Sequence, residues 1–176
     1  MADPTNESTT LEVKNPVLER MRADQAALGL LVRLGRSGEI ARIAKASGHD
    51  FLFMDVQHAI FDVETIAHIA STAVAIGVAP LVRVRGVHDP DVSLLLDNGV
   101  TGIVFPDVNT AADARKAVDT CRFAPLGKRS VGASFPQFEG RTVPVAEATR
   151  IINASTVVVC MIETVEGLAN LDEIAA

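Results

Sequence analysis

Short apolar runs alternate with stretches of helical periodicity along most of the chain, and this alternation limits the possible folds more than any other feature. The clearest run is Phe51-Leu-Phe-Met-Asp55, which has the length and continuous apolar character of a buried strand. Five runs are expected to form strands: Leu28–Val32, Phe51–Asp55, Leu81–Val84, Gly102–Phe105 and Thr156–Ile162. Strands spaced about 25 residues apart, with a helix in each connection, predict right-handed parallel β-α units.

The segments between and around these runs have the spacing and the terminal residues of helices. Asp62 can cap one of them and Gly77 can end it, while Asp89-Pro90 is typical of a helix start. The expected helices are Val17–Ala27, Glu39–Ser47, Asp62 to Gly77, Asp89 to Asn98, Ala111–Cys121, Val145–Ile152 and Val165–Ala176. The segment from Arg122 to Gly140 has no clear periodicity, and such length favours a functional role.

Two architectures accommodate parallel β-α units: a (β/α)8 TIM barrel and a doubly wound open sheet. A dinucleotide-binding sheet needs a Gly-x-Gly-x-x-Gly turn, and the sequence contains none. The barrel is favoured because its active sites lie at the carboxyl ends of the strands, where this chain has polar residues. A barrel takes about 250 residues, so the chain is expected to supply five or six of the eight units. We predict a mobile N-terminal tail at residues 1–16 and an incomplete barrel domain at residues 17–176.

Charge and composition exclude several classes of function. The 176 residues carry a formal net charge of −6, which argues against nucleic-acid binding because no basic stripe is available to contact phosphates. No apolar run approaches the roughly 20 residues of a membrane-spanning helix, and the polar N-terminal residues lack the pattern of a signal peptide. Cys121 and Cys160 are expected to be inert thiols of a reducing compartment, so the protein is expected in the cytoplasm.

Polar residues stand at the ends of the predicted strands, and these residues are the candidates for chemistry. They are Arg33, Asp55, His58, Arg83, Asp107 and Glu163. Parallel neighbouring strands would bring these side chains to one rim. There His58, oriented by Asp55, could act as a general base, Arg83 could clamp a substrate carboxylate, and Glu163 could hold a divalent cation.

Each of these residues also has a purely structural interpretation. His58 could cap the following helix or bond to loop carbonyls. Arg83 could form a surface pair with Arg85, and a single glutamate such as Glu163 at a strand end is often only solvated or salt-bridged. The shared position of the residues, rather than any one of them, supports a functional site.

Five spaced motifs carry a resemblance to a known family. They are Asp55-Val-Gln-His58, Pro80-Leu-Val-Arg83, Val108-Asn-Thr110 with Ala114-Arg115, Arg122-Phe-Ala-Pro-Leu-Gly-Lys-Arg-Ser130 and Met161-Ile-Glu-Thr164. In this order they resemble the HpcH/HpaI family, which comprises metal-dependent class II aldolases of 2-keto acids such as 4-hydroxy-2-oxo-heptanedioate. The resemblance covers roughly residues 25 to 176 and points to the family more specifically than to a substrate.

The resemblance implies a TIM-barrel lyase that cleaves or forms 4-hydroxy-2-oxo acids through a pyruvate enolate, with pyruvate and an aldehyde as its small-molecule partners. It implies a divalent metal cofactor (Mg²⁺, Mn²⁺ or Co²⁺) bound by Glu163. It assigns the base to His58 and the preceding acid to Asp55. It assigns pyruvate binding to Arg83, and a further catalytic aspartate of the family matches Asp97. Family members commonly form homo-oligomers, including hexamers, so an oligomer is expected.

Two departures from the family pattern keep other functions open. Gln57 stands where many relatives have Glu, and the family's second metal-binding aspartate would lie beyond Ala176. One alternative is a related metal-enolate enzyme, such as an oxaloacetate decarboxylase or a citrate-lyase-type enzyme. The other is a catalytically inactive, truncated or assembly subunit.

Overall fold

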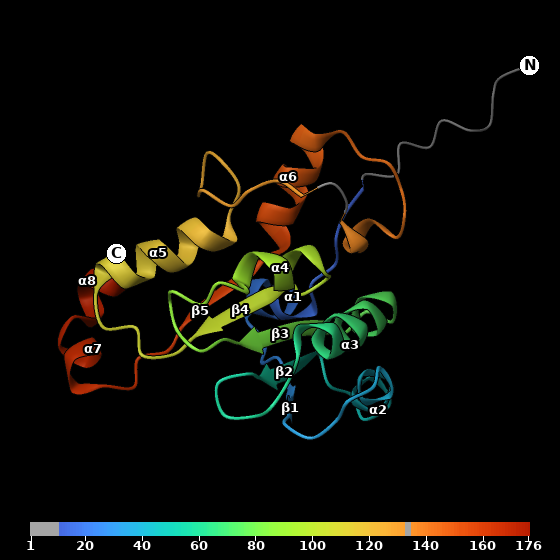
Figure 1. Ribbon diagram of the computed structural model, residues 1–176, viewed down its shortest axis with the longest axis horizontal. Coiled ribbons are helices and arrows are strands. Elements are labelled where there is room, and N and C mark those ends of the chain that lie inside the picture. Colours follow the sequence, from blue (N-terminus) through green and yellow to red (C-terminus); the bar gives the residue numbers. More distant parts are fainter. Residues whose placement is uncertain (1–10, 133–134) are drawn as a thin grey trace, which may run out of the picture.

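The core of the protein is one parallel β-sheet, seen in the computed structural model, which describes residues 11–132 and 135–176 (Figure 1). Its strands are β1 (Gly29–Val32), β2 (Phe51–Asp55), β3 (Ala79–Arg83), β4 (Gly102–Phe105) and β5 (Val157–Cys160). The strands lie in the sheet in the same order as in the chain, β1-β2-β3-β4-β5, and every neighbouring pair is parallel. The predicted α/β fold of consecutive parallel units is confirmed, with five strands.

Helices fill each connection between strands, as expected, and further helices precede β1 and follow β5. They are α1 (Pro16–Arg22), α2 (Glu39–Ala46), α3 (Val63–Ala75), α4 (Val92–Asp97), α5 (Ala111–Cys121), the 3-10 helix η1 (Pro136–Phe138), α6 (Val145–Ser155), α7 (Val165–Ala169) and α8 (Leu171–Ala175). Among the described helices, none is both long enough and apolar enough to cross a bilayer.

Several helix boundaries differ from the predictions, and three of the differences have a clear local reason. The helix expected to reach Ala27 ends at Arg22, because Asp24 adopts a left-handed conformation with φ 54°. Asp89 does not cap α4, because its carboxylate accepts the backbone N–H groups of Arg85 and Asp91 in the preceding loop. The helix expected over Val165–Ala176 is divided at Asn170, whose side chain donates to the carbonyl oxygen of Asn109.

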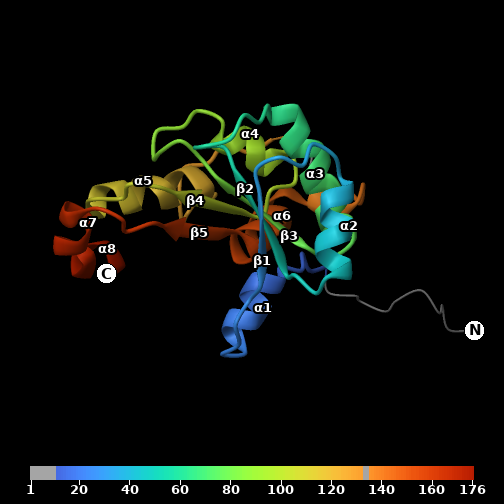
Figure 2. The ribbon, with the colours of Figure 1, turned by 90° about the horizontal axis from the view of Figure 1, so that it is seen from below.

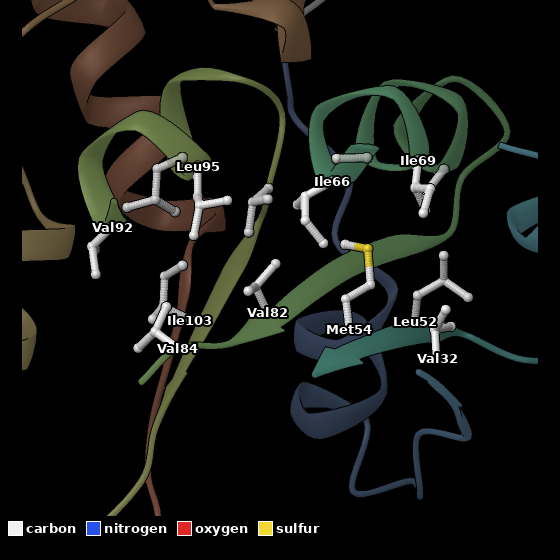
Figure 3. Close-up of a cluster of buried hydrophobic side chains, with 14 of the residues drawn as sticks. Val32, Leu52, Met54, Ile66, Ile69, Val82, Val84, Val92, Leu95 and Ile103 are labelled. Carbon is white, nitrogen blue, oxygen red and sulfur yellow. The ribbon is translucent and has the colours of Figure 1, made fainter. Parts of the chain in front are cut away.

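One face of the sheet packs under helices and forms the main core (Figure 3). Alternate strand residues such as Met54 and Val82 point from the sheet toward Ile66 of α3. Farther along, Ile103 lies beneath Leu95 of α4. All five side chains are at most 3% exposed, and fully burying a side chain of this size stabilises the fold by about 1.5–3 kcal/mol.

The opposite face of the sheet packs against α1, which lies across the sheet from α3 and α4 (Figure 2). Val17 of α1 packs with Leu81 and Val157 in a smaller cluster. Gly102 makes this packing possible, because a Cβ there would lie 2.8 Å from Cγ of Leu81 and 3.0 Å from Cβ of Val157. Since strand side chains alternate between faces, residues in register with Leu81 lie on this face of the sheet, which is called the inner face below.

The predicted N-terminal tail falls mostly on residues 1–10, which lie outside the described part of the chain. Within residues 11–16, Val13 and Asn15 are buried. The Asn15 side chain donates to the carbonyl oxygens of Thr101 and Ser155 at the amino-terminal side of the sheet. These residues therefore pack as part of the domain.

The long segment before α6 contributes an additional core. Phe123 and Phe138 are at most 2% exposed and pack with Ile151 and Ile152 of α6. Phe135 makes edge-to-face contacts with both phenylalanine rings. Packing accounts for the phenylalanines of this segment, whose residues 133–134 lie outside the description.

Both cysteines are free, and neither environment favours a reactive thiolate. Burial raises the pKa of the Cys121 thiol to about 12, and it also raises the pKa of Cys160. Both thiols therefore stay protonated at neutral pH, in agreement with their predicted inertness.

Candidate functional site

Three charged residues meet on the inner face of the sheet at the carboxyl ends of β1, β2 and β3. Asp55 and Arg83 are direct neighbours in the register of β2 and β3. Arg33 follows Val32, which is in register with Met54, so Arg33 lies beside Asp55. The apolar strands thus bring together residues that are up to 50 positions apart in the sequence.

Asp55 is the centre of this group and is only 1% exposed. Its carboxylate accepts hydrogen bonds from Arg83 Nε at 3.0 Å and Arg83 Nη2 at 2.8 Å, and from the His58 backbone N–H at 3.2 Å. Arg33 Nε lies 3.5 Å from Oδ2. Burial alone would raise the pKa of this carboxyl, but the Arg83 and His58 hydrogen bonds and nearby positive charges lower it overall, so Asp55 remains ionised.

Arg83 is held in a single orientation by this pairing, with its side chain 16% exposed. The hydrogen bonds to Asp55, and the charges of Asp55 and Glu163, raise the pKa of Arg83 despite its burial. Only the Nε–Nη2 edge of the guanidinium faces Asp55. Among residues 11–132 and 135–176, none bonds to Nη1, so the second edge can receive an anionic group.

His58 is exposed, and its backbone rather than its ring is fixed by the protein. Its N–H donates to Asp55, and its carbonyl oxygen accepts from Arg33 Nη2 at 2.6 Å. The sequence suggested that Asp55 orients the imidazole directly. In the structure the hydrogen bond from His58 to Asp55 comes from the peptide group, so any orientation is transmitted through the backbone.

Glu163 and Asp107 form a second group at the ends of β4 and β5. Oε1 of Glu163 accepts the backbone N–H of Asp107 at 3.0 Å. Asp107 has a φ of 53°, which turns the chain sharply after β4. Both side chains are exposed. Because Glu163 contributes to the raised pKa of Arg83, its carboxylate lies within electrostatic reach of the first group.

Asp97 is the one candidate that the structure does not bring to this rim. It is the last residue of α4, which runs back from the end of β3 toward the start of β4. Its Oδ1 accepts from Arg129 Nη2 at 2.6 Å, and the Arg129 side chain is fully buried. Asp97 therefore lies near the amino ends of the strands, because a helix in a β-α unit reverses the chain direction.

The described residues fit a divalent cation only in part. Glu163 has the carboxylate chemistry that Mg²⁺ prefers, and it stands at a strand end in an exposed position. Within the described ranges there is no group of three His, Cys, Asp or Glu side chains placed to hold a metal ion. Glu163 can therefore serve as one ligand of a site that needs further ligands.

Arg33 is a polar residue at a strand end for which the sequence predicts no specific role. The structure shows that its guanidinium contacts both Asp55 and the His58 carbonyl. The signal available in the sequence was the alternation along β1, which puts Arg33 on the same face as Leu31.

Comparison with known proteins shows the family of this chain. The family model for HpcH/HpaI aldolase/citrate lyase matches residues 29–176. A 4-hydroxy-4-methyl-2-oxoglutarate aldolase of Chaetomium globosum is 35% identical over 166 residues, which are 92% of this chain and 61% of that protein. A 2-keto-3-deoxy-L-rhamnonate aldolase of Escherichia coli K12 is 30% identical over 162 residues, covering 92% of this chain and 60% of that enzyme.

A solved structure agrees with the sequence relatives. The crystal structure of an HpcH/HpaI aldolase from Desulfitobacterium hafniense DCB-2 superposes with a TM-score of 0.84 at 30% identity, covering 90% of this chain and 61% of the other. The chain thus spans about three fifths of the length of its relatives, and its five strands are β-α units of a TIM-barrel fold. The chain belongs to the HpcH/HpaI aldolase/citrate lyase family.

Proposed function

We propose that the protein is a divalent-metal-dependent aldolase that cleaves or forms 4-hydroxy-2-oxo acids through a pyruvate enolate. The observation that carries this proposal is the buried Asp55–Arg83 pair, beside an exposed His58 and within electrostatic reach of Glu163. The names of the relatives support the substrate class, since they describe aldolases of 4-hydroxy-4-methyl-2-oxoglutarate and of 2-keto-3-deoxy-L-rhamnonate.

Arg83 is proposed to bind the carboxylate of the 2-oxo acid. Its Nε–Nη2 edge is fixed on Asp55, which leaves Nη1 to donate to the substrate. A guanidinium held rigidly by a buried carboxylate pays little reorganisation energy when negative charge develops on the substrate. Asp55 therefore acts as the residue that positions Arg83.

His58 is proposed to transfer the proton of the aldol hydroxyl, directly or through one water molecule. Its exposed imidazole suits exchange of a proton with substrate and solvent. Histidine is well matched to this task because its ordinary pKa lies near neutral pH. The contacts of Asp55 and Arg33 with the His58 peptide hold the imidazole at the rim.

Glu163 is proposed as one ligand of the metal, which is Mg²⁺, Mn²⁺ or Co²⁺. Such a cation, when bound, would polarise the keto oxygen of the substrate. The hydrogen bond from Asp107 occupies Oε1 and restrains the Glu163 carboxylate. Homo-oligomer formation and a cytoplasmic location remain predictions from the family resemblance and the composition.

Pyruvate release from a 4-hydroxy-2-oxo acid tests the proposal on the complete protein. We expect cleavage with Mg²⁺ or Mn²⁺ and its loss in EDTA. His58→Ala should lower kcat by roughly 10²- to 10⁴-fold, while Mn²⁺ binding measured by calorimetry is retained. The control is His68→Ala, since this exposed residue on α3 pairs with Glu64 at the surface. Cleavage that survives EDTA, or equal losses in the two variants, would refute the assignment.

A second candidate is an enzyme that acts on oxaloacetate through the same group of residues. One solved structure at 30% identity and a TM-score of 0.78 is a citrate synthase, of which the chain covers 59%. Oxaloacetate consumption, measured with and without 4-hydroxy-2-oxo acids as competitors, distinguishes this candidate from the aldolase. Absence of turnover with every donor would favour a catalytically inactive assembly subunit.

A further inference from the structure

Two arginines of the loop between β1 and α2 reach across to the loop that carries His58. Arg33 Nη2 donates to the carbonyl oxygen of His58 at 2.6 Å. Arg36 Nη2 donates to the carbonyl oxygen of Ile60, also at 2.6 Å, and its guanidinium lies 4.2 Å from the centre of the Phe61 ring. The loop between β1 and α2 is therefore joined to the loop after β2 by charge-assisted hydrogen bonds from its arginines to the backbone of the second loop.

Arg33 differs from Arg36 because it also contacts the centre of the candidate site. Its Nε lies 3.5 Å from Oδ2 of Asp55, the same oxygen that accepts from Arg83 Nη2. The other carboxylate oxygen, Oδ1, accepts the N–H of His58. Asp55 and Arg33 thus hold the His58 backbone on both sides of its Cα, Asp55 at the N–H and Arg33 at the carbonyl oxygen.

This arrangement needs the shape of an arginine. The guanidinium presents N–H groups in a rigid plane, so one side chain can reach the carboxylate and the carbonyl together. A lysine ammonium is a single point charge on a flexible chain and would hold one of the two partners at a time. Arg33 is about half exposed, so its contribution lies in geometry more than in burial.

We propose that Arg33 is a positioning residue for His58, acting through the His58 backbone and not through substrate. The inference depends on the proton-transfer role proposed for His58. Proton transfer depends steeply on the placement of the base, and displacement by about 1 Å can cost 10²-fold in rate. Loss of the Arg33 contacts should therefore lower kcat and leave substrate binding nearly intact.

The test compares Arg33→Met, Arg33→Lys and the control Arg42→Met in the complete, metal-loaded protein. Arg42 is an exposed arginine on α2, the helix that follows this loop, so its variant removes the same charge from a nearby position. We expect Arg33→Met to lower kcat roughly 10- to 100-fold with KM changed less than about twofold. Arg33→Lys should lose less, and Arg42→Met should behave as wild type.

Amide hydrogen exchange provides a readout that does not depend on activity. Loss of a charge-assisted hydrogen bond should speed exchange at residues 56–60 at least about tenfold in Arg33→Met, with no change in Arg42→Met. Thermal unfolding confirms that each variant is folded.

Three results would overturn the inference. A higher KM with normal kcat would mean that Arg33 contacts substrate instead. Unchanged exchange at residues 56–60 would show that the contacts do not restrain the loop, and faster exchange with normal kcat would remove the positioning role. Failure of the aldolase proposal would be seen separately, because the wild-type protein would then cleave no 4-hydroxy-2-oxo acid. In that case amide hydrogen exchange alone decides whether Arg33 restrains the loop.

Discussion

At the scale of single residues, the central feature is a buried carboxylate with several donors. A buried charge without partners is strongly destabilising, whereas Asp55 has two hydrogen bonds from Arg83, one from the His58 backbone and the nearby Arg33. Removing the carboxylate charge would leave two arginines facing one another. The same contacts that stabilise Asp55 also shape the candidate site, so its stability and its function are linked.

Acid titration of stability tests this view of Asp55. The pKa of this carboxyl is lowered in the folded protein, so its contribution is complete above the unfolded value of about 3.9 and is lost as pH falls through the folded value. Asp55→Asn should cost about 3–5 kcal/mol at pH 7, and the difference from wild type should shrink below about pH 4. Urea unfolding at pH 7 and at lower pH measures both effects.

A surface carboxylate provides the control for that experiment. Asp119 pairs with the exposed Lys128, and a pair of this kind contributes about 0–1 kcal/mol. Asp119→Asn should therefore change stability little at either pH. A stability difference for Asp55→Asn that does not vary with pH would contradict the assigned ionisation.

At the scale of elements, the loops after β4 and β5 are joined by caps and side-chain bonds. Thr110 caps α5, with Asp113 returning a bond to the Thr110 N–H in a capping box. Thr164 caps α7 and also donates to the side chain of Asn109. Together with the bond from the Asp107 N–H to Glu163, these contacts join the loop that carries the proposed metal ligand to the loop after β4.

Substitution of the cap measures how strongly α5 depends on it. Thr110→Ala should destabilise the protein by about 1 kcal/mol, because the Asp113 N–H loses its acceptor. Thr120→Ala on the same helix is the matched control, since its hydroxyl donates to the Lys116 carbonyl oxygen within the helix. Thermal unfolding of the two variants should rank Thr110→Ala as the less stable, and equal stabilities would argue against the capping box.

At the scale of the whole molecule, the sheet has two open edges and an inner face that is only partly covered. β1 and β5 each pair with one neighbour in the described sheet. Leu31 on β1 is 58% exposed, and Val165 and Leu168 after β5 are 88% and 65% exposed. Exposed strand edges and apolar patches promote association with other chains.

A polypeptide of residues 1–176, expressed alone, should therefore bind the dye ANS and self-associate. The substitution Leu31→Asn should weaken both effects, because it removes apolar surface from the open inner face. Leu94→Asn is the control, since Leu94 is 48% exposed on α4. Sedimentation over a range of concentrations checks the prediction, and a monomer without ANS binding would contradict it.

Periodicity predicted the fold well where local signals agree. The bounds of β2, β4 and α5 match the prediction residue for residue, because apolar runs mark the two strands and the Thr110 cap marks the start of α5. Asp62 caps α3, as predicted. The predicted helix bounds were wrong where a contact with a distant residue decides where a helix ends. Asn170, which bonds to the carbonyl oxygen of Asn109, divides the last predicted helix in this way. The separation of Asp97 from the other candidates was not predicted either, because it depends on the direction in which α4 runs.

The sequence by itself determined the parallel β-α order, the family and the set of polar residues at the strand ends, since each depends on local spacing and residue type. Only the tertiary structure decided which of these residues touch. The pairing of Asp55 with Arg83, its bond to the His58 backbone and the bridging position of Arg33 depend on strand register and loop conformation. Those are set by how the strands pack side by side, which no short stretch of sequence specifies.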